Sequence, residues 1–296
     1  MLDAFAANAV VRDTLDEASE ALGQNLGRLI AEGPAEELNL TTNTQPVMLT
    51  AACAIHRAWQ QAGGPVPVIV AGHSLGEYTA LVVAGVLAFR DAVPLVRFRA
   101  QAMQNAVPVG EGGMAAILGL DDEAVRAICT EASASGAGVV ETANFNAPAQ
   151  VVIAGHRAAV DKACEIAKAK GAKRALPLPV SAPFHSSLLK PASDQLRDYL
   201  ANVTLHAPTI PVVNNVDVAM VHDPAAIRDA LVRQAAGPVR WTECVQTIAA
   251  QGVTHLLECG PGKVLTGLTR RIDGNLAGLS INDPASLDEA LKLVAV

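Results

Sequence analysis

Residues 66–76 constrain the fold of this chain more than any other stretch. Residues 66–71 form a valine-rich apolar run between a Gly-Gly-Pro turn and Gly72, which predicts a strand. A helical pattern follows from residue 75 to about 87. Between them lies Gly72-His73-Ser74-Leu75-Gly76, a G-x-S-x-G sequence whose glycines leave room for a sharp turn. The order strand, tight turn, helix predicts a nucleophile elbow with an exposed Ser74 hydroxyl.

The rest of the chain alternates between Val/Ile-rich runs and amphipathic stretches, which is typical of an α/β protein. Near the C-terminus the pattern predicts three further strands, at residues 210–213, 255–258 and 279–281. Residues 113–181 follow the order β-α-β-β-α-β, the ferredoxin-like pattern. We therefore expect a large α/β domain, made of residues 1–112 and 182–296, that is interrupted by a small ferredoxin-like domain at 113–181.

Composition excludes several classes of protein. A net charge of −7 argues against a nucleic-acid-binding surface. The longest apolar run without a charge has 12 residues, at 78–89, and is too short to cross a membrane. The five cysteines contain no Cys-x-x-Cys pair, which argues against a disulfide framework and a zinc site. With no signal peptide at the start, we expect reduced thiols, no metal and a cytoplasmic protein.

A nucleophilic serine needs a base and an oxyanion site. The backbone N–H of Leu75, at the start of the expected helix, is a natural oxyanion donor. Seven histidines are candidates for the base, and His185 lies in the loop where the inserted segment returns to the large domain. No Asp or Glu stands out as the third member of a triad. Arg99, on the helix after the elbow helix, could hold a substrate carboxylate through two parallel hydrogen bonds, or could lie on a solvated helix face.

Several motifs together resemble the malonyl-CoA:acyl carrier protein transacylase family of bacterial type II fatty-acid synthesis. They are Gly72-His-Ser-Leu-Gly-Glu-Tyr78, Arg99-Ala-Gln-Ala-Met-Gln, Asn144-Phe-Asn-Ala-Pro-Ala-Gln-Val-Val-Ile-Ala-Gly, Pro179-Val-Ser-Ala-Pro-Phe-His185, Pro211-Val-Val-Asn-Asn-Val-Asp and Glu258-Cys-Gly-Pro-Gly-Lys-Val-Leu-Thr-Gly. The resemblance runs through essentially the whole chain. It implies an α/β-hydrolase-like large domain with an inserted ferredoxin-like domain.

The resemblance also implies a mechanism of acyl transfer. Ser74 would take the malonyl group from malonyl-CoA and pass it to the phosphopantetheine thiol of acyl carrier protein, with His185 as the general base. The backbone carbonyl of Gln234 would orient His185, Arg99 would pair with the malonyl carboxylate, and Leu75 would supply one oxyanion N–H. A monomer that needs no cofactor and meets its carrier protein transiently is expected from the family.

The start of the chain departs from the family pattern. Family members begin with a buried strand and a Pro-Gly-Gln-Gly-Ser-Gln loop, and the first Gln of that loop supplies a second oxyanion N–H. In this sequence Met1 aligns just after that loop. We expect the native protein to carry this segment before Met1. Losing one oxyanion donor costs on the order of 10²–10³ in rate.

Two other functions fit parts of the sequence. A serine esterase would have the same elbow, but it predicts an acidic triad member and has no need for Arg99. A catalytically impaired binding protein is the reading that follows if the chain truly begins at Met1.

Overall fold

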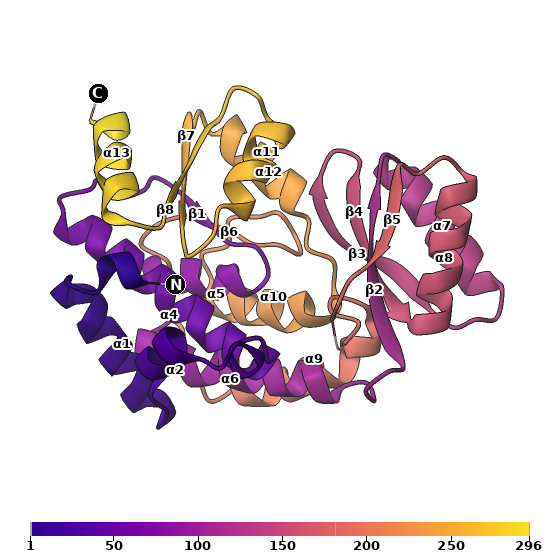
Figure 1. The fold of residues 1–296 in the computed structure, drawn as a ribbon, viewed down its shortest axis with the longest axis horizontal. Coiled ribbons are helices and arrows are strands. Elements are labelled where there is room, and N and C mark those ends of the chain that lie inside the picture. The colour runs from indigo at the N-terminus through magenta and orange to yellow at the C-terminus, as the bar shows by residue number, and fades with distance from the viewer. Residues whose placement is uncertain (1, 181, 296) are drawn as a thin grey trace.

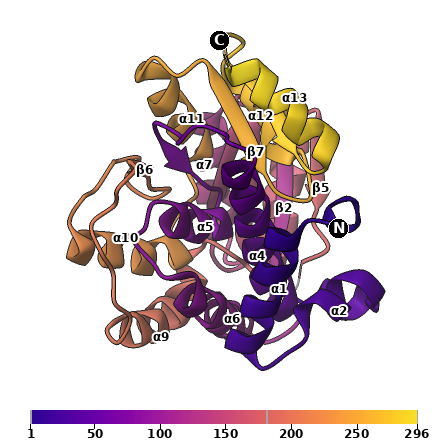
Figure 2. The same cartoon turned by 90° about the vertical axis from the view of Figure 1, so that its left-hand side faces the viewer.

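The computed structural model describes residues 2–180 and 182–295. It places a group of N-terminal helices at one end of the molecule and a four-stranded sheet at the other (Figure 1). Seen from the helical end, α1 and α4 lie on the side that faces the viewer (Figure 2). The elements before the first strand are η1 (Asp3–Phe5), α1 (Ala9–Leu22), α2 (Leu26–Glu32), α3 (Ala35–Leu38) and α4 (Thr41–Gln61).

The large part of the molecule contains two short parallel sheets. β1 (Val70–Ala71) pairs with β6 (Val212–Val213), and β7 (His255–Cys259) pairs with β8 (Ala277–Ile281). The helices around them are α5 (Leu75–Val83), α6 (Phe89–Asn105), α9 (Lys190–Leu200), α10 (Pro224–Ala236), α11 (Trp241–Ala250), α12 (Val264–Ile272) and α13 (Pro284–Val294), with η2 (Ser187–Leu189) before α9. Asp223 and Asp283 cap the starts of α10 and α13, as their Asp-Pro sequences predict.

The strand expected at 66–71 is much shorter in the structure, where only Val70 and Ala71 pair with a neighbour. Val66 and Val68 are 70% and 75% exposed. The stretch before β1 and the strand β7 both line one cavity of about 320 Å³. A valine-rich run becomes a ladder only where another strand offers hydrogen-bond partners, and here such a partner begins at Val212. The prediction was therefore right about the position of the strand and wrong about its length.

The small part of the molecule has the expected order of elements. Its antiparallel sheet has the strand order β3-β4-β2-β5. Its elements are β2 (Gly112–Leu118), α7 (Asp122–Ala134), β3 (Val140–Ala147), β4 (Gln150–His156), α8 (Arg157–Ala169) and β5 (Arg174–Pro177). One core joins the sheet to α7 and α8 through Ile117, Ile128, Ile153 and Val160.

The small sheet is joined directly to the large part. Phe145 N donates to Val239 O at 2.9 Å, and Val239 N donates to Ala143 O at 2.8 Å, so β3 continues its hydrogen bonding beyond its own sheet. The domain division into 1–112 with 182–296 and 113–181 remains a prediction. Among the described residues, no helix is both long enough and apolar enough to cross a membrane.

Candidate active site

The elbow between β1 and α5 holds Ser74 in an unusual backbone conformation. Ser74 has φ 51° and ψ −106°, outside the regions that side-chain-bearing residues ordinarily occupy. A Cβ at Gly72 would lie 2.0 Å from the Gly76 carbonyl, so only glycine allows this close approach. A Cβ at Gly76 would meet nothing within 4 Å. The expectation that both glycines make room for the turn therefore holds for Gly72 and fails for Gly76.

His185 forms a short hydrogen bond with Ser74. Its Nε2 lies 2.6 Å from Ser74 Oγ, and its Nδ1 faces the backbone carbonyls of Gln234 at 2.9 Å and Gly237 at 3.2 Å. Because two carbonyls can only accept, Nδ1 carries the proton and the Nε2 lone pair faces the serine hydroxyl. Among the described residues, no carboxylate bonds to this ring. The pair is a serine–histidine dyad oriented by neutral groups.

The charge state of His185 follows from its surroundings. Burial, assisted by the positive charge of Arg99, lowers its pKa from 6.5 to about 3, although the two carbonyls oppose the shift. The imidazole is therefore neutral near pH 7 and can accept the serine proton.

Arg99 lies beside the reacting hydroxyl and is 1% exposed. Its Nη2 donates to Ser74 Oγ and to Gln234 Oε1, both at 3.0 Å, and its Nη1 donates to Gln45 Oε1 at 2.8 Å. The guanidinium also lies 5.3 Å from the centre of the Tyr78 ring. These contacts decide between the two sequence interpretations of Arg99: it is a buried cation at the serine, and it does not lie on a solvated face.

Leu75 opens α5 directly after the serine. Its backbone N–H meets no acceptor among the described residues, and the positive end of the α5 dipole lies at the same point. Ser74 N, by contrast, donates to Asn215 Oδ1 at 2.7 Å. Leu75 N–H is therefore placed to stabilise negative charge that develops next to Ser74.

The structure thus brings together all five residues that the sequence singled out, and it adds others. Gln45 bonds Arg99, and Asn215 bonds Ser74. His73 points away from the serine and bonds Asn146 Oδ1 at 2.8 Å. Asn215 and Asn146 lie in motifs that carry the family resemblance, but an amide has no chemistry that assigns it a role from sequence. Gln45 lies in a helical stretch without any motif, so no sequence signal could have found it.

No group of three or more His, Cys, Asp or Glu side chains within the described part of the chain is arranged to hold a metal ion.

Comparison with known proteins places the chain in a family. The acyl transferase domain family matches residues 2–272. The malonyl CoA-acyl carrier protein transacylase of Salmonella typhimurium is 59% identical over 292 residues, which is 98% of this chain and 94% of that protein. The protein of the same name from Escherichia coli is 57% identical over 293 residues, covering 99% of this chain and 94% of the relative.

Solved structures agree with these relatives. An acyl-carrier-protein S-malonyltransferase from Burkholderia pseudomallei has 79% identity and a TM-score of 0.97, and the match covers 98% of this chain and 94% of that one. A malonyl-transacylase in complex with a type II polyketide synthase acyl-carrier protein has 52% identity and a TM-score of 0.96, with the same coverage. The expected fold, a large α/β-hydrolase-like part with a ferredoxin-like insert, is confirmed. The chain belongs to the acyl transferase domain family, and within it to the malonyl CoA-acyl carrier protein transacylases.

Proposed function

We propose that this protein transfers a malonyl group from malonyl-CoA to the phosphopantetheine thiol of an acyl carrier protein. The observation that carries the proposal is the buried Arg99 guanidinium 3.0 Å from Ser74 Oγ, beside a serine–histidine dyad. A serine activated by a neutral histidine can accept an acyl group, and a buried arginine favours an acyl group that ends in a carboxylate. The names of the relatives agree with this substrate and acceptor.

The first half-reaction forms the acyl-enzyme. Ser74 Oγ attacks the thioester carbonyl of malonyl-CoA while His185 Nε2 takes the hydroxyl proton, and the oxyanion forms beside Leu75 N–H. The carbon–sulfur bond then breaks, and His185 returns the proton to the departing CoA thiolate. The Gln234 and Gly237 carbonyls hold the ring throughout, and they stabilise the imidazolium that exists between the two proton transfers.

The second half-reaction repeats these steps with another thiol. His185 takes the proton of the phosphopantetheine thiol, the sulfur attacks the malonyl ester, and the Ser74 oxygen leaves with the proton from His185. One dyad therefore serves both transfers, and the free serine is restored at the end.

Arg99 has two effects in this mechanism. A malonyl carboxylate that pairs with its guanidinium supplies binding free energy that an acetyl group lacks. The same carboxylate neutralises the cation whose charge lowers the pKa of His185, so the imidazole becomes a stronger base when the correct substrate binds. Substrate recognition and base strength are coupled through one residue.

The esterase alternative explains less of the site. An esterase that hydrolyses neutral esters gains nothing from a buried cation at its nucleophile, and no carboxylate orients His185 among the described residues. The alternative of an impaired binding protein leaves the 2.6 Å contact between Ser74 and His185 without a purpose.

We further propose that the protein acts as a monomer in the cytoplasm. The family resemblance supports a monomer, and the five free cysteine thiols fit a reducing compartment.

The proposal is tested by trapping the acyl-enzyme. Incubation with malonyl-CoA should add one malonyl group to the wild-type protein, seen by intact mass spectrometry and mapped by peptide analysis to Ser74. Ser74→Ala should not be labelled, whereas Ser193→Ala, which removes a buried hydroxyl on α9, should be labelled like the wild type. Failure of the wild type to acquire the adduct, or full labelling of Ser74→Ala, would refute the proposed function.

A further inference from the structure

Glu77 is a buried carboxylate that the mechanism above does not use. It lies in the first turn of α5, three residues after Ser74, and is 2% exposed. Its Oε2 accepts two hydrogen bonds, one from Asn215 N at 2.9 Å and one from Gln234 Nε2 at 3.0 Å. Burying a carboxylate is costly, so a chain that keeps one here gains something from its two bonds.

The first bond leads to the nucleophile. Asn215 is 0% exposed and follows β6. Its side-chain Oδ1 accepts from Ser74 N at 2.7 Å, and its Nδ2 donates to Gly72 O at 2.9 Å. One amide therefore fixes the backbone on both sides of His73, in a turn whose φ at Ser74 is 51°. Glu77 therefore fixes the backbone of Asn215, and the side chain of Asn215 in turn fixes the backbone of the elbow.

The second bond leads to the base and to the cation. Gln234 is also 0% exposed, and its Nε2 donates to Ser74 O at 2.9 Å as well as to Glu77. Its side-chain Oε1 accepts from Arg99, while its backbone carbonyl accepts from His185. Glu77 and the Ser74 carbonyl together set the orientation of the Gln234 amide, because only its nitrogen end can donate to these two acceptors. The oxygen end of the same Gln234 amide then accepts the hydrogen bond from Arg99.

We propose that Glu77 is a positioning residue for acyl transfer, whose ionised carboxylate holds Asn215 and Gln234 so that Ser74, His185 and Arg99 keep their mutual geometry. The identity of the transferred group rests on the proposed function, whereas the positioning role does not.

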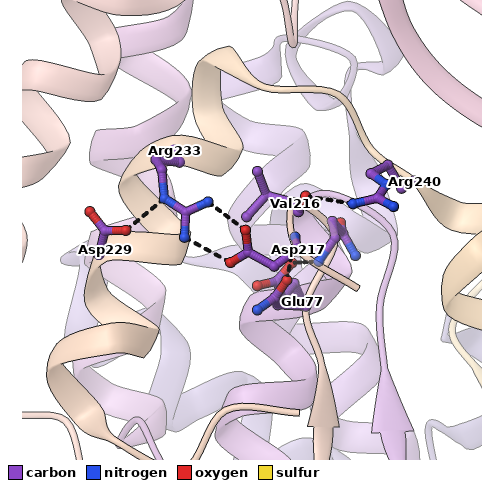
Figure 3. Close-up of polar contacts among 8 residues, drawn as sticks. Glu77, Val216, Asp217, Asp229, Arg233 and Arg240 are labelled. Carbon is purple, nitrogen blue, oxygen red and sulfur yellow. Dashed lines mark hydrogen bonds and ion pairs between the residues drawn. The ribbon is translucent and has the colours of Figure 1, made fainter. Parts of the chain in front are cut away.

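The electrostatic surroundings make this role dependent on pH. Burial raises the pKa of Glu77 to about 7, despite the bonds from Asn215 and Gln234 that lower it. Figure 3 shows Glu77 beside Asp217, whose charge Arg233 binds through two contacts of 2.7 Å. The charged or titratable groups that interact with Glu77 are Arg99 from α6, Asp217 from the loop after β6, Tyr78 beside it on α5, and Cys244 from α11. The ionised carboxylate of Glu77, which is the better hydrogen-bond acceptor, is therefore the main form above about pH 7.

The test compares three variants in the full chain. Glu77→Ala removes both acceptor contacts, and Glu77→Gln keeps an oxygen at the same place without the charge. Asp229→Asn is the matched control, because it removes one negative charge from a neighbouring exposed ion pair with Arg233 (Figure 3). The rate of Ser74 phosphonylation by a fluorophosphonate probe is measured between pH 5 and 9, followed by the rate of malonylation by malonyl-CoA. The probe reports nucleophile geometry whatever the natural acyl group is.

We expect Glu77→Ala to lose about 10²-fold in both rates, the usual size of a small misplacement of reacting groups. Glu77→Gln should recover part of that loss, up to the rate that the wild type shows at low pH, where Glu77 is also uncharged but still offers an acceptor oxygen. The wild type should show a fall in rate below about pH 7, which Asp229→Asn retains and Glu77→Gln lacks.

Wild-type rates in Glu77→Ala, equal losses in Glu77→Ala and Glu77→Gln, or a fall below pH 7 that persists in Glu77→Gln would each overturn the positioning role. If Glu77→Ala does not fold, the pH profile of Glu77→Gln decides alone. A wild-type protein that reacts with the probe and not with malonyl-CoA would refute the proposed function, and the probe rates would still test Glu77.

Discussion

Replacing Arg99 with alanine removes the cation that bonds the reacting serine and should change which acyl group the protein prefers. Breaking a buried, hydrogen-bonded ion pair costs about 3–5 kcal/mol. If malonyl acylation depends on such a pair, its rate should fall roughly 10²–10⁴-fold, at about 1.4 kcal/mol per factor of ten. An acetyl group has no carboxylate to lose, so its rate should change much less. The malonyl-to-acetyl ratio therefore isolates the ion pair from general damage to the site.

Loss of the same charge should strengthen the base. Arg99 lowers the pKa of His185, and removing a positive charge favours the imidazolium, so the pKa should rise from about 3 toward its usual range. In Arg99→Ala the rate of acetylation should then begin to fall at a higher pH than in the wild type as the solution is acidified. This effect is separate from carboxylate recognition because acetyl-CoA reports it.

The assay is single-turnover labelling of Ser74 with malonyl-CoA or acetyl-CoA, quenched in acid and read by intact mass. Arg97→Ala is the matched control: Arg97 lies on the same helix but donates to Gln24 and Asn43, away from the serine. An unchanged malonyl-to-acetyl ratio in Arg99→Ala, or an equal change in Arg97→Ala, would refute the assignment of Arg99 to the substrate carboxylate.

Four further substitutions test the architecture of the site. Gly72→Ala places a Cβ 2.0 Å from the Gly76 carbonyl and should lower both the melting temperature and Ser74 labelling, whereas Gly76→Ala meets open space and should leave both near wild type; equal effects would contradict the elbow geometry. Glu77→Gln should raise the free energy of unfolding at pH 8 by about 3 kcal/mol more than at pH 4. The reason is that the folded pKa of about 7 exceeds the usual 4.5, so the wild type loses stability as pH rises from about 4.5 to about 7. Urea unfolding at both pH values measures this, and a constant difference would contradict it. Asn146→Ala leaves the half-buried His73 without its partner and should cost about 0.5–1.5 kcal/mol in unfolding while Ser74 labelling falls less than tenfold; a larger loss of labelling would show that His73 matters for catalysis.

The sequence could predict those parts of the site in which the residue type, or its position in a motif, by itself indicates a chemical role. Ser74 was predictable from the elbow pattern, and Leu75 N–H follows from its position at a helix start. Among seven histidines, His185 was singled out by its loop, where the inserted segment returns to the large domain, and the family resemblance then assigned it the role of base. Arg99 and Arg97 are two positions apart on one helix, and only packing shows that the first is buried against Ser74.

The parts that could not be predicted depend on partners distant in sequence. Residues 66–69 have the composition of a strand, yet whether they pair is decided by which strand lies next to them. Their exposed valines and the neighbouring cavity show an unpaired edge at this point. Asn215 and Gln45 are polar residues whose roles arise because distant segments bring them to Ser74 and Arg99. The local sequence pattern thus predicts where a helix or strand lies along the chain, but it does not predict which distant segments lie next to it.

The absence of a carboxylate on His185 fits the presence of Arg99. A carboxylate at Nδ1 would raise the pKa of the imidazole, but it would also place a permanent negative charge near the guanidinium and compete with an anionic acyl group for it. Gln234 avoids this conflict, because its backbone carbonyl orients His185 and its side-chain oxygen meets Arg99, both without net charge. Among the described residues, Glu77 bonds the other end of that amide and makes no hydrogen bond to Arg99. On the proposed function, neutral orienting groups leave the Arg99 charge available to the substrate. The base then becomes stronger when a carboxylate arrives, although burial still holds its pKa below the usual range.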